Sequence, residues 1–258
     1  MNAVLEFGYL VAAGVGAGLI GSIAGLASLI SYPALLATGI PPVTANVTNT
    51  VSLVLTGVGS VSASRPELKG QGRRLVPLAV AAMLGGTAGA ALLLLTPSEA
   101  FERIVPWLIG GAALAILVQP PPAELALEGV RHHAGRPHRD PRWLPLGTFA
   151  IAIYGGYFGA AAGVVMLAMF LLGTGEGLPR GNAMRNAILG VANGIAAVGF
   201  VLFTSVAWSA AIPLAFGCLC GSLLGPRVVR RLPQTLLRRV IAVAGLALAV
   251  HLGIQAYG

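Results

Sequence analysis

Charge is scarce in this 258-residue sequence, in which only 9% of the residues are Asp, Glu, Lys or Arg. A soluble domain carries roughly 25% charged residues, so these charges are too few to cover a water-exposed surface. They also cluster, because six long stretches hold none: residues 7–64, 75–98, 104–123, 143–175, 186–226 and 240–258. A soluble enzyme, a secreted disulfide-rich protein and a disordered chain are therefore excluded.

Cysteines and catalytic motifs are equally sparse. Cys218 and Cys220 are the two cysteines of the chain, and on a helix their side chains would point about 200° apart. We therefore expect them to pack as small apolar residues rather than to form a disulfide or hold a metal. The sequence contains no H-E-x-x-H or G-x-S-x-G motif and no paired acids in its apolar stretches, so it predicts neither an enzyme nor a cofactor or metal site.

Hydrophobic residues make up 56% of the chain, and one helical crossing of a bilayer needs about 20 of them in succession. The sequence therefore predicts an all-α multi-pass protein of the cytoplasmic membrane. The alternating pattern of a transmembrane β-barrel is missing. Residues 1–6 contain no Lys or Arg, so we interpret the first apolar stretch as mature protein rather than as a signal peptide.

Two halves of the sequence match each other at a nearly constant offset along the chain. The match predicts a repeat of residues 1–118 and 143–258, joined by a cytoplasmic linker at 119–142, within one integrated membrane domain. It rests on glycines, prolines and asparagines that recur in the same order, namely Gly21 with Gly159, Gly25 with Gly163, Pro42 with Pro179, Asn49 with Asn186, Gly57 with Gly194, and Pro77 with Pro213.

Each half contains four hydrophobic segments, expected at about 7–39, 43–63, 75–95 and 101–118, and at about 143–174, 187–204, 208–225 and 236–256. The first segment of each half is unusually long, because the charge-free sequence runs over 7–39 in one half and over 143–175 in the other. As one helix it would measure about 50 Å, against a hydrocarbon core of about 30 Å. Glycines in the middle of both stretches suit either close helix packing or a break into two shorter helices, as a re-entrant hairpin or two short crossings.

The positions of the basic residues favour the break. If each first segment crosses once, the 16 Lys and Arg residues divide equally between the two faces. If it returns to the face where it began, the halves are inverted and every basic residue except Arg103 falls on one face. Because cytoplasmic loops are enriched in Lys and Arg, we predict two inverted repeats, each with a glycine-broken first segment and three transmembrane helices. Both termini then lie outside, and the basic loops bind no nucleic acid.

Inverted repeats with broken helices are typical of secondary transporters, because exposed backbone groups are tolerated in a membrane only where they line a site. The second helix of each broken segment should begin near residues 25–28 and 163–165. Helix N-termini attract anions, and the expected crossings contain no carboxylate that would suit a cation, apart from Glu102 near a helix end. We therefore expect a site for a small anion, with a transporter of another solute or a non-transporting scaffold as alternatives. A coupling ion (H⁺ or Na⁺) and a homo-oligomer stay open.

The order of these motifs resembles the sulfite exporter TauE/SafE family of membrane permeases, over nearly the whole chain. The resemblance implies transport of sulfur-containing anions such as sulfite or sulfonates, in either direction. The sequence departs from the family pattern at residues 26–28, where Leu-Ala-Ser replaces consecutive glycines, and at Arg185, which stands in place of a Thr. The resemblance rests on Gly18-Leu-Ile-Gly21-Ser-Ile-Ala-Gly25, Tyr32-Pro33 and Ala45-Asn46-Val47-Thr48-Asn49, and on Gly155-Gly156-Tyr-Phe-Gly159-Ala-Ala-Ala-Gly163 and Asn182-Ala183-Met184-Arg185-Asn186.

The candidate substrate-binding residues come from the two breaks and the polar stretches that follow them. Hydroxyl and amide side chains in an apolar helix either line a wet vestibule or bond to neighbouring helices, and a serine can also bond to its own helix. Arg185 is expected near the start of a helix, either as an anion ligand or as one more cytoplasmic loop charge. The candidates are Gly25, Ser28, Asn46, Thr48, Asn49, Gly163, Arg185 and Asn186.

Overall fold

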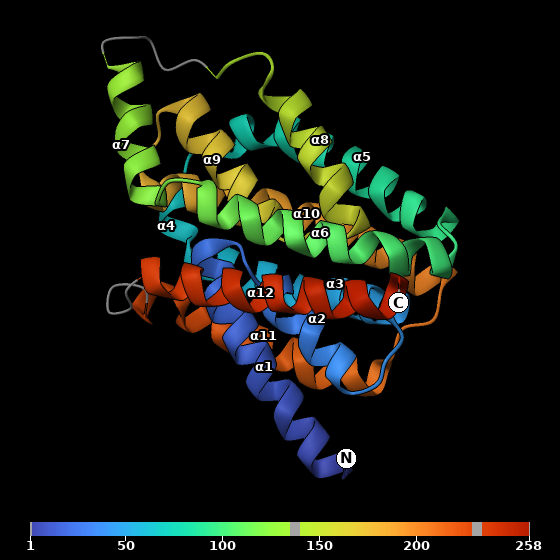
Figure 1. Ribbon diagram of the computed structural model, residues 1–258. Helices are drawn as coiled ribbons and strands as arrows, with labels where there is room; N and C mark the ends of the chain where they lie inside the picture. The colour runs from blue at the N-terminus through green and yellow to red at the C-terminus, as the bar shows by residue number, and fades with distance from the viewer. Residues whose placement is uncertain (1, 135–139, 229–233, 258) are drawn as a thin grey trace.

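The computed structural model describes residues 2–134, 140–228 and 234–257, and these residues form twelve α-helices (Figure 1). Four arginines used in the charge count, at positions 136, 139, 230 and 231, lie outside the described residues. The helices are α1 Ala3–Ala24, α2 Ser28–Ala37, α3 Pro42–Ala63, α4 Arg65–Leu68, α5 Gly72–Leu95, α6 Ser98–Val118, α7 Pro122–His133, α8 Leu144–Tyr157, α9 Ala162–Thr174, α10 Leu178–Phe203, α11 Trp208–Val228 and α12 Gln234–Tyr257.

Six helices of the described chain, α1, α5, α6, α10, α11 and α12, are long and apolar enough to cross a membrane. The helices α2, α8 and α9 are apolar but shorter. The expected crossing at 43–63 corresponds to α3, which has 22 residues but is not among the six apolar candidates. Its first half carries the polar cluster of residues 46–52, so α3 has the length of a crossing without the usual hydropathy. The all-helical membrane class is confirmed.

The first long apolar stretch is broken, as the charge pattern predicted. Helix α1 ends at Ala24, Gly25 adopts φ +75°, and α2 begins at Ser28. The amide of Gly25 donates a hydrogen bond to the carbonyl oxygen of Gly21 at 2.9 Å, which closes the last turn of α1. Because this left-handed conformation costs glycine little, the residue fixes the position of the break. The alternative of a single long helix is wrong for this stretch.

The second long apolar stretch is broken in the same way between α8 and α9. Gly159 adopts φ +76° and Ala161 adopts φ +58°, and Ala161 is the non-glycine residue with positive φ in the described chain. The hydroxyl of Tyr154 donates to the carbonyl oxygen of Ala160 at 2.7 Å. Side chains with a Cβ pay a penalty in this region of backbone space, so the second break holds one strained alanine.

Replacing Ala161 with glycine should stabilise the protein. Relief of the left-handed strain should raise the free energy of unfolding by about 1 kcal/mol, measured by thermal unfolding in detergent. Ala162 begins helix α9, so Ala162→Gly is the matched control and should lower stability by a similar amount. A loss of stability in both variants would show that Ala161 is not strained.

Glycines bring helices of the two chain halves into backbone contact. Helix α1 packs on α11, and α5 packs on α8. A Cβ added at Gly18 would lie 2.1 Å from the carbonyl oxygen of Cys218, and one added at Gly89 would lie 2.0 Å from that of Ile153. These crossings need small residues, as in other membrane helix pairs. Because each pair joins a helix of one half to a helix of the other, residues 1–118 pack closely against residues 143–258.

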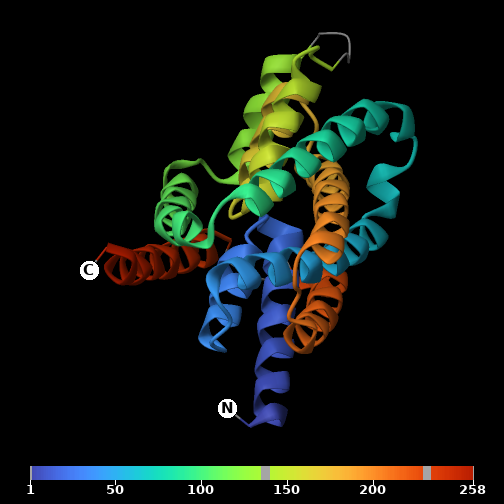
Figure 2. The same cartoon turned by 90° about the vertical axis from the view of Figure 1, so that its right-hand side faces the viewer.

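Helices α3 and α10 cross at the centre of the molecule, where a Cβ added at Gly57 would lie 3.0 Å from the Cα of Gly190. Helices α6 and α12 form an antiparallel pair at one edge (Figures 1 and 2). In α12 the buried Arg238 donates hydrogen bonds to backbone carbonyl oxygens at the end of α6, those of Ile116, Gln119 and Pro120. This arginine therefore caps the C-terminus of a helix.

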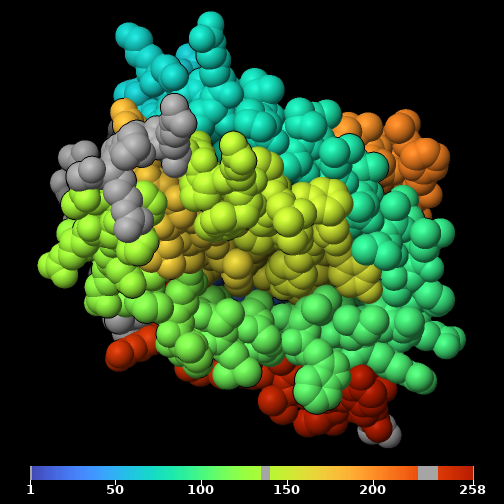
Figure 3. All heavy atoms as spheres, turned by 90° about the horizontal axis from the view of Figure 1, so that it is seen from above, coloured from blue at the N-terminus to red at the C-terminus, as the bar shows by residue number. Residues whose placement is uncertain are grey.

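Aromatic side chains join α6 to the second break. The ring of Phe101 lies 5.9 Å from that of Tyr157 and 6.1 Å from that of Phe158, and Tyr32 of α2 meets Phe158 edge-on at 5.3 Å. From above, a narrow crease separates α6 from the α8–α9 segment on the surface (Figure 3). The aromatic contacts fix the position of Phe158, which also lines the central cavity.

The linker at 119–142 contains the amphipathic helix α7, which packs on α9 through Leu125, Ala126 and Gly129. Beyond α7, an ion-pair network joins the start of α5 to the turn before α10. Arg74 pairs with Asp140 and Glu176, each at 2.5 Å. These charges connect the first turn of α5 to the loops before α8 and α10 at one end of the molecule.

Candidate functional site

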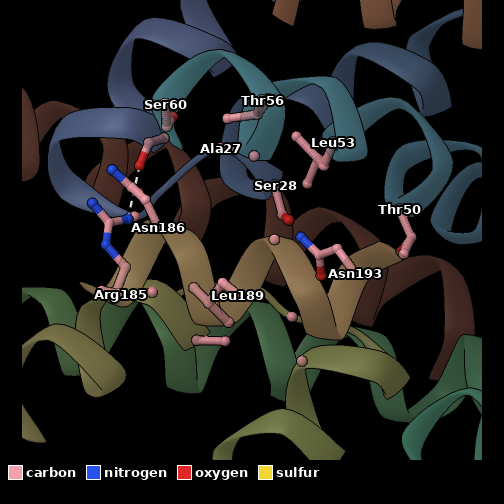
Figure 4. A pocket seen from close by; sticks show the side chains of 18 of the residues that line it. Ala27, Ser28, Thr50, Leu53, Thr56, Ser60, Arg185, Asn186, Leu189 and Asn193 are labelled. Atoms are coloured by element: carbon pink, nitrogen blue, oxygen red, sulfur yellow. Dashed lines mark hydrogen bonds between the residues drawn. The ribbon is translucent and has the colours of Figure 1, made fainter. Parts of the chain in front are cut away.

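A cavity of about 60 Å³ lies between the two helix breaks and the crossing of α3 and α10 (Figure 4). The breaks contribute Gly25, Ser28, Phe158 and Gly163, while α3 and α10 contribute the remaining walls. Each wall therefore comes from a different part of the sequence. Five of the eight candidates line the cavity: Gly25, Ser28, Gly163, Arg185 and Asn186.

The two breaks touch at Gly25 and Gly163. A Cβ added at Gly25 would lie 2.6 Å from the carbonyl carbon of Gly163, and one added at Gly163 would lie 2.7 Å from the Cα of Gly25. In the described chain, the N–H groups of Ser28 and Gly163 meet no backbone acceptor, as expected in the first turn of a helix. Two helix N-termini thus present free amides at the cavity.

Arg185 is the charged residue of this cavity, and its side chain is 1% exposed. Its Nη1 donates to the carbonyl oxygen of Gly21 at 2.8 Å, and its Nη2 donates to that of Ser22 at 3.0 Å and to Oδ1 of Asn182. The guanidinium therefore caps the C-terminus of α1, where the helix dipole is negative. Its Nε has no hydrogen-bond partner among the described residues.

The electrostatics of Arg185 suit a small anion. Within the described part of the chain no carboxylate lies within ion-pairing distance of it. Carbonyl dipoles offset part of the cost of burying the charge, but a buried cation normally also has an anionic partner. A negative ligand would balance the charge and would provide an acceptor for a hydrogen bond from Nε.

Arg185 lies deeper in its helix than the sequence suggested. We expected the helix to start near residue 187, but α10 begins at Leu178, with Pro179 in its first turn. Proline suits the first helical position because its missing N–H has no partner there. Arg185 is therefore two turns inside α10 and buried, so its interpretation as a loop charge is wrong.

Ser28 is held in place by α3. The side-chain amide of Asn49 donates to Oγ of Ser28 at 3.3 Å, and the hydroxyl of Ser31 donates to Oδ1 of Asn49 at 2.5 Å. The one hydroxyl proton of Ser31 also has a second acceptor within reach, the carbonyl oxygen of Ala27 at the start of its own helix, at 3.0 Å, so the two bonds are alternatives. Asn49 itself does not line the cavity, so it supports Ser28 from behind.

Two asparagines hold the ends of the broken helices across the halves. The amide of Asn46 in α3 donates to the carbonyl oxygen of Tyr157 at the end of α8, at 2.8 Å. The amide of Asn182 in α10 donates to that of Ser22 near the end of α1, at 2.9 Å. Asn46 therefore bonds between helices, whereas Asn186 both lines the cavity and donates to Ser22 at 3.2 Å.

Thr48 lies outside the cavity and accepts a hydrogen bond from the amide of Ala207 at 3.1 Å, just before α11. The sequence reasoning missed Thr56 and Ser60, which line the cavity from α3. The available signal was their spacing. Thr56 and Ser60 lie four residues apart and therefore share one helix face, a continuation of the polar cluster into the apolar half of α3.

Comparison with known proteins gives the family. Residues 10–252 match the family model described as Sulfite exporter TauE/SafE. The chain is 28% identical to the probable membrane transporter protein ORF9 of Sinorhizobium sp., over 95% of this chain and 91% of that protein. It is 27% identical to the probable membrane transporter protein YfcA of Escherichia coli K12, over 100% and 93%.

A probable membrane transporter protein of Haemophilus influenzae is 26% identical, over 91% of this chain and 89% of its own length. No solved structure matches the chain. The family model covers most of the sequence, and these relatives are named as transporters rather than enzymes. The chain therefore belongs to the TauE/SafE family of membrane transporters.

Proposed function

We propose that this protein is a secondary transporter of small sulfur-containing anions, such as sulfite, sulfonates or related oxyanions, across the cytoplasmic membrane. The observation that carries the proposal is Arg185, a buried cation without a carboxylate partner in the described chain, in a cavity between two helix breaks. The family description of a sulfite exporter agrees with an anionic substrate.

The size of the cavity supports a small substrate. Pockets for drug-sized ligands measure about 300 Å³ or more, whereas this cavity measures about 60 Å³. A few waters or one small oxyanion fit such a space. A sugar or a peptide would require the walls to separate.

We further propose that residues 1–118 and 143–258 are inverted repeats and that transport proceeds by alternating access around this cavity at the membrane midplane. Paired contacts support this arrangement, because α1 packs on α11 as α8 packs on α5. Asn46 and Asn182, which lie one position apart when the halves are aligned through Asn49 and Asn186, also bind the ends of the opposite broken helices. The basic loops would then face the cytoplasm, with both termini outside.

Uptake into proteoliposomes tests the proposed substrate class. Purified protein should give saturable uptake of radiolabelled sulfite or methanesulfonate, inhibited by an excess of related oxyanions and unaffected by sugars or divalent cations. Protein-free vesicles set the background. If none of the oxyanions moves while a cation or neutral solute does, the proposed function is wrong.

Cysteine labelling tests the inverted topology. In a chain with Cys218 and Cys220 replaced by alanine, single cysteines at Asn2, Pro66 and Ala256 should react with an impermeant reagent in different compartments. Positions 2 and 256 should be labelled from outside intact cells, and position 66 only after the membrane is opened. Labelling of position 256 only from the cytoplasm would refute the inverted arrangement.

A further inference from the structure

Ser60 is a buried residue of the cavity whose hydroxyl has no assigned role. It lies on α3, is 1% exposed, and its Oγ has no hydrogen-bond partner among the described residues. The close view shows Ser60 with Asn186 and Arg185 at one end of the cavity, while Thr50 and Asn193 lie toward the other end (Figure 4). The unpaired hydroxyl is thus at the charged end.

The lack of a hydrogen-bond partner for the Ser60 hydroxyl is unusual for a buried serine in a helix. A buried serine or threonine ordinarily donates to the carbonyl four residues back. Two neighbours on α3 do so: the hydroxyl of Ser52 donates to the carbonyl oxygen of Thr48 at 2.8 Å, and the hydroxyl of Thr50 donates to the carbonyl oxygen of Asn46 at 3.0 Å. A buried hydroxyl without a partner costs about 1–3 kcal/mol, so a partner that arrives with the substrate would recover this free energy.

Arg185 also lines this cavity, and its Nε is a second buried donor without a hydrogen-bond partner among the described residues. Ser60 comes from α3 and Arg185 from α10, so the two donors approach from different helices. The hydroxyl of Thr56, which also lines the cavity, has no hydrogen-bond partner among the described residues either, but it lies beside the thiol of Cys218 in α11, and we assign no ligand contact to it. Two donors on two walls call for a ligand with at least two acceptor atoms.

We propose that Ser60 is a specificity-determining residue, whose hydroxyl and the Nε of Arg185 donate to two different oxygens of one oxyanion. This inference rests on the proposed anion transport and specifies the ligand further. One buried cation balances one negative charge, so the preferred ligand is a monoanion with several oxygens. A halide offers one atom that both donors would have to share, and linear thiocyanate has its two acceptor atoms, S and N, at opposite ends, so neither anion presents two neighbouring oxygens to the two donors.

Affinities of two anions test the role of Ser60. Methanesulfonate is a monoanion with three oxygens, and thiocyanate is a linear monoanion. In the purified protein, Ser60→Ala should weaken methanesulfonate binding about tenfold, as expected for a hydrogen bond to a charged group, and change thiocyanate binding less than about twofold. Ser60→Thr, which keeps the hydroxyl, should restore most of the methanesulfonate affinity.

Ser52→Ala is the matched control, because Ser52 is a buried serine of the same helix whose hydroxyl is paired outside the cavity. It should leave both affinities unchanged. Equal losses for both anions in Ser60→Ala would mean a structural effect and overturn the proposal, as would an unchanged methanesulfonate affinity. In those cases the proposed anion site at Arg185 is still supported if Arg185→Gln abolishes methanesulfonate binding.

The remaining outcomes also decide the proposal. If the unaltered protein binds methanesulfonate but not thiocyanate, the site already requires an anion with several oxygens. The methanesulfonate affinities of Ser60→Ala and Ser60→Thr then show whether the hydroxyl of Ser60 contacts one of these oxygens. If it binds neither anion, the proposed function fails together with this inference.

Discussion

Arg185→Gln should abolish anion binding and transport. The substitution removes the positive charge of the cavity and the unpaired Nε donor. Truncating one partner of a buried charge pair costs about 2–5 kcal/mol, so affinity should fall about 100-fold or more. Isothermal titration with methanesulfonate and proteoliposome uptake measure the two losses. Arg185→Lys should recover little, because an ammonium lacks the forked donors that cap α1 and face the ligand.

A buried arginine elsewhere in the chain provides the control for Arg185. Arg238 also donates to carbonyl oxygens at the end of a helix, and it lies outside the cavity. Arg238→Gln should therefore lower thermal stability as Arg185→Gln does, through the lost cap, and leave anion affinity intact. If Arg185→Gln binds methanesulfonate within about threefold of the unaltered protein, the charge does not recognise the substrate.

Gly25→Ala should prevent the two breaks from meeting. The new Cβ would lie 2.6 Å from the carbonyl carbon of Gly163 and 2.7 Å from Nη1 of Arg185, at a residue with φ +75°. Left-handed strain costs about 1–2 kcal/mol and overpacking about 1–3 kcal/mol. We expect the free energy of unfolding to fall by about 2–5 kcal/mol and anion binding to be lost, measured by thermal unfolding and by titration of the protein that remains folded.

Gly39 separates the two causes, because it also has positive φ, +84°, but nothing lies within 4 Å of its added Cβ. Gly39→Ala should show the strain alone and keep full anion affinity. Similar stability losses for the two substitutions, with anion binding preserved in both, would show that close approach at Gly25 is not needed.

The breaks were predictable because they depend on local properties of the chain. A hydrophobic segment such as 7–39 or 143–174 is too long for one crossing and too short for two, and glycine identifies where the backbone turns. Helix α2 starts at Ser28, within the expected 25–28, and α9 starts at Ala162, one residue before the expected 163–165. The polar cluster of α3 also carried a usable signal, because those residues share helix faces.

The sequence did not predict which face of each helix packs against which neighbouring helix, because this depends on packing between segments that are distant in the chain. Asn46 reaches Tyr157 and Thr48 reaches Ala207, contacts that join the first half of the chain to the second. Both side chains therefore hold helices together rather than line the cavity. Arg185 was misplaced because the start of α10 depends on Pro179 rather than on hydropathy, which marks only the apolar core of a helix.

The position of a bound anion tests the central claim most directly. Methaneselenonate is the selenium analogue of methanesulfonate, and anomalous scattering from selenium would locate it in crystals of the protein. We predict one site in the cavity between Gly25 and Gly163, with ligand oxygens about 3 Å from Nε of Arg185. An occupied site elsewhere, such as beside Arg180 at the start of α10 near the ion-pair network, with the cavity empty at saturating ligand, would contradict the account.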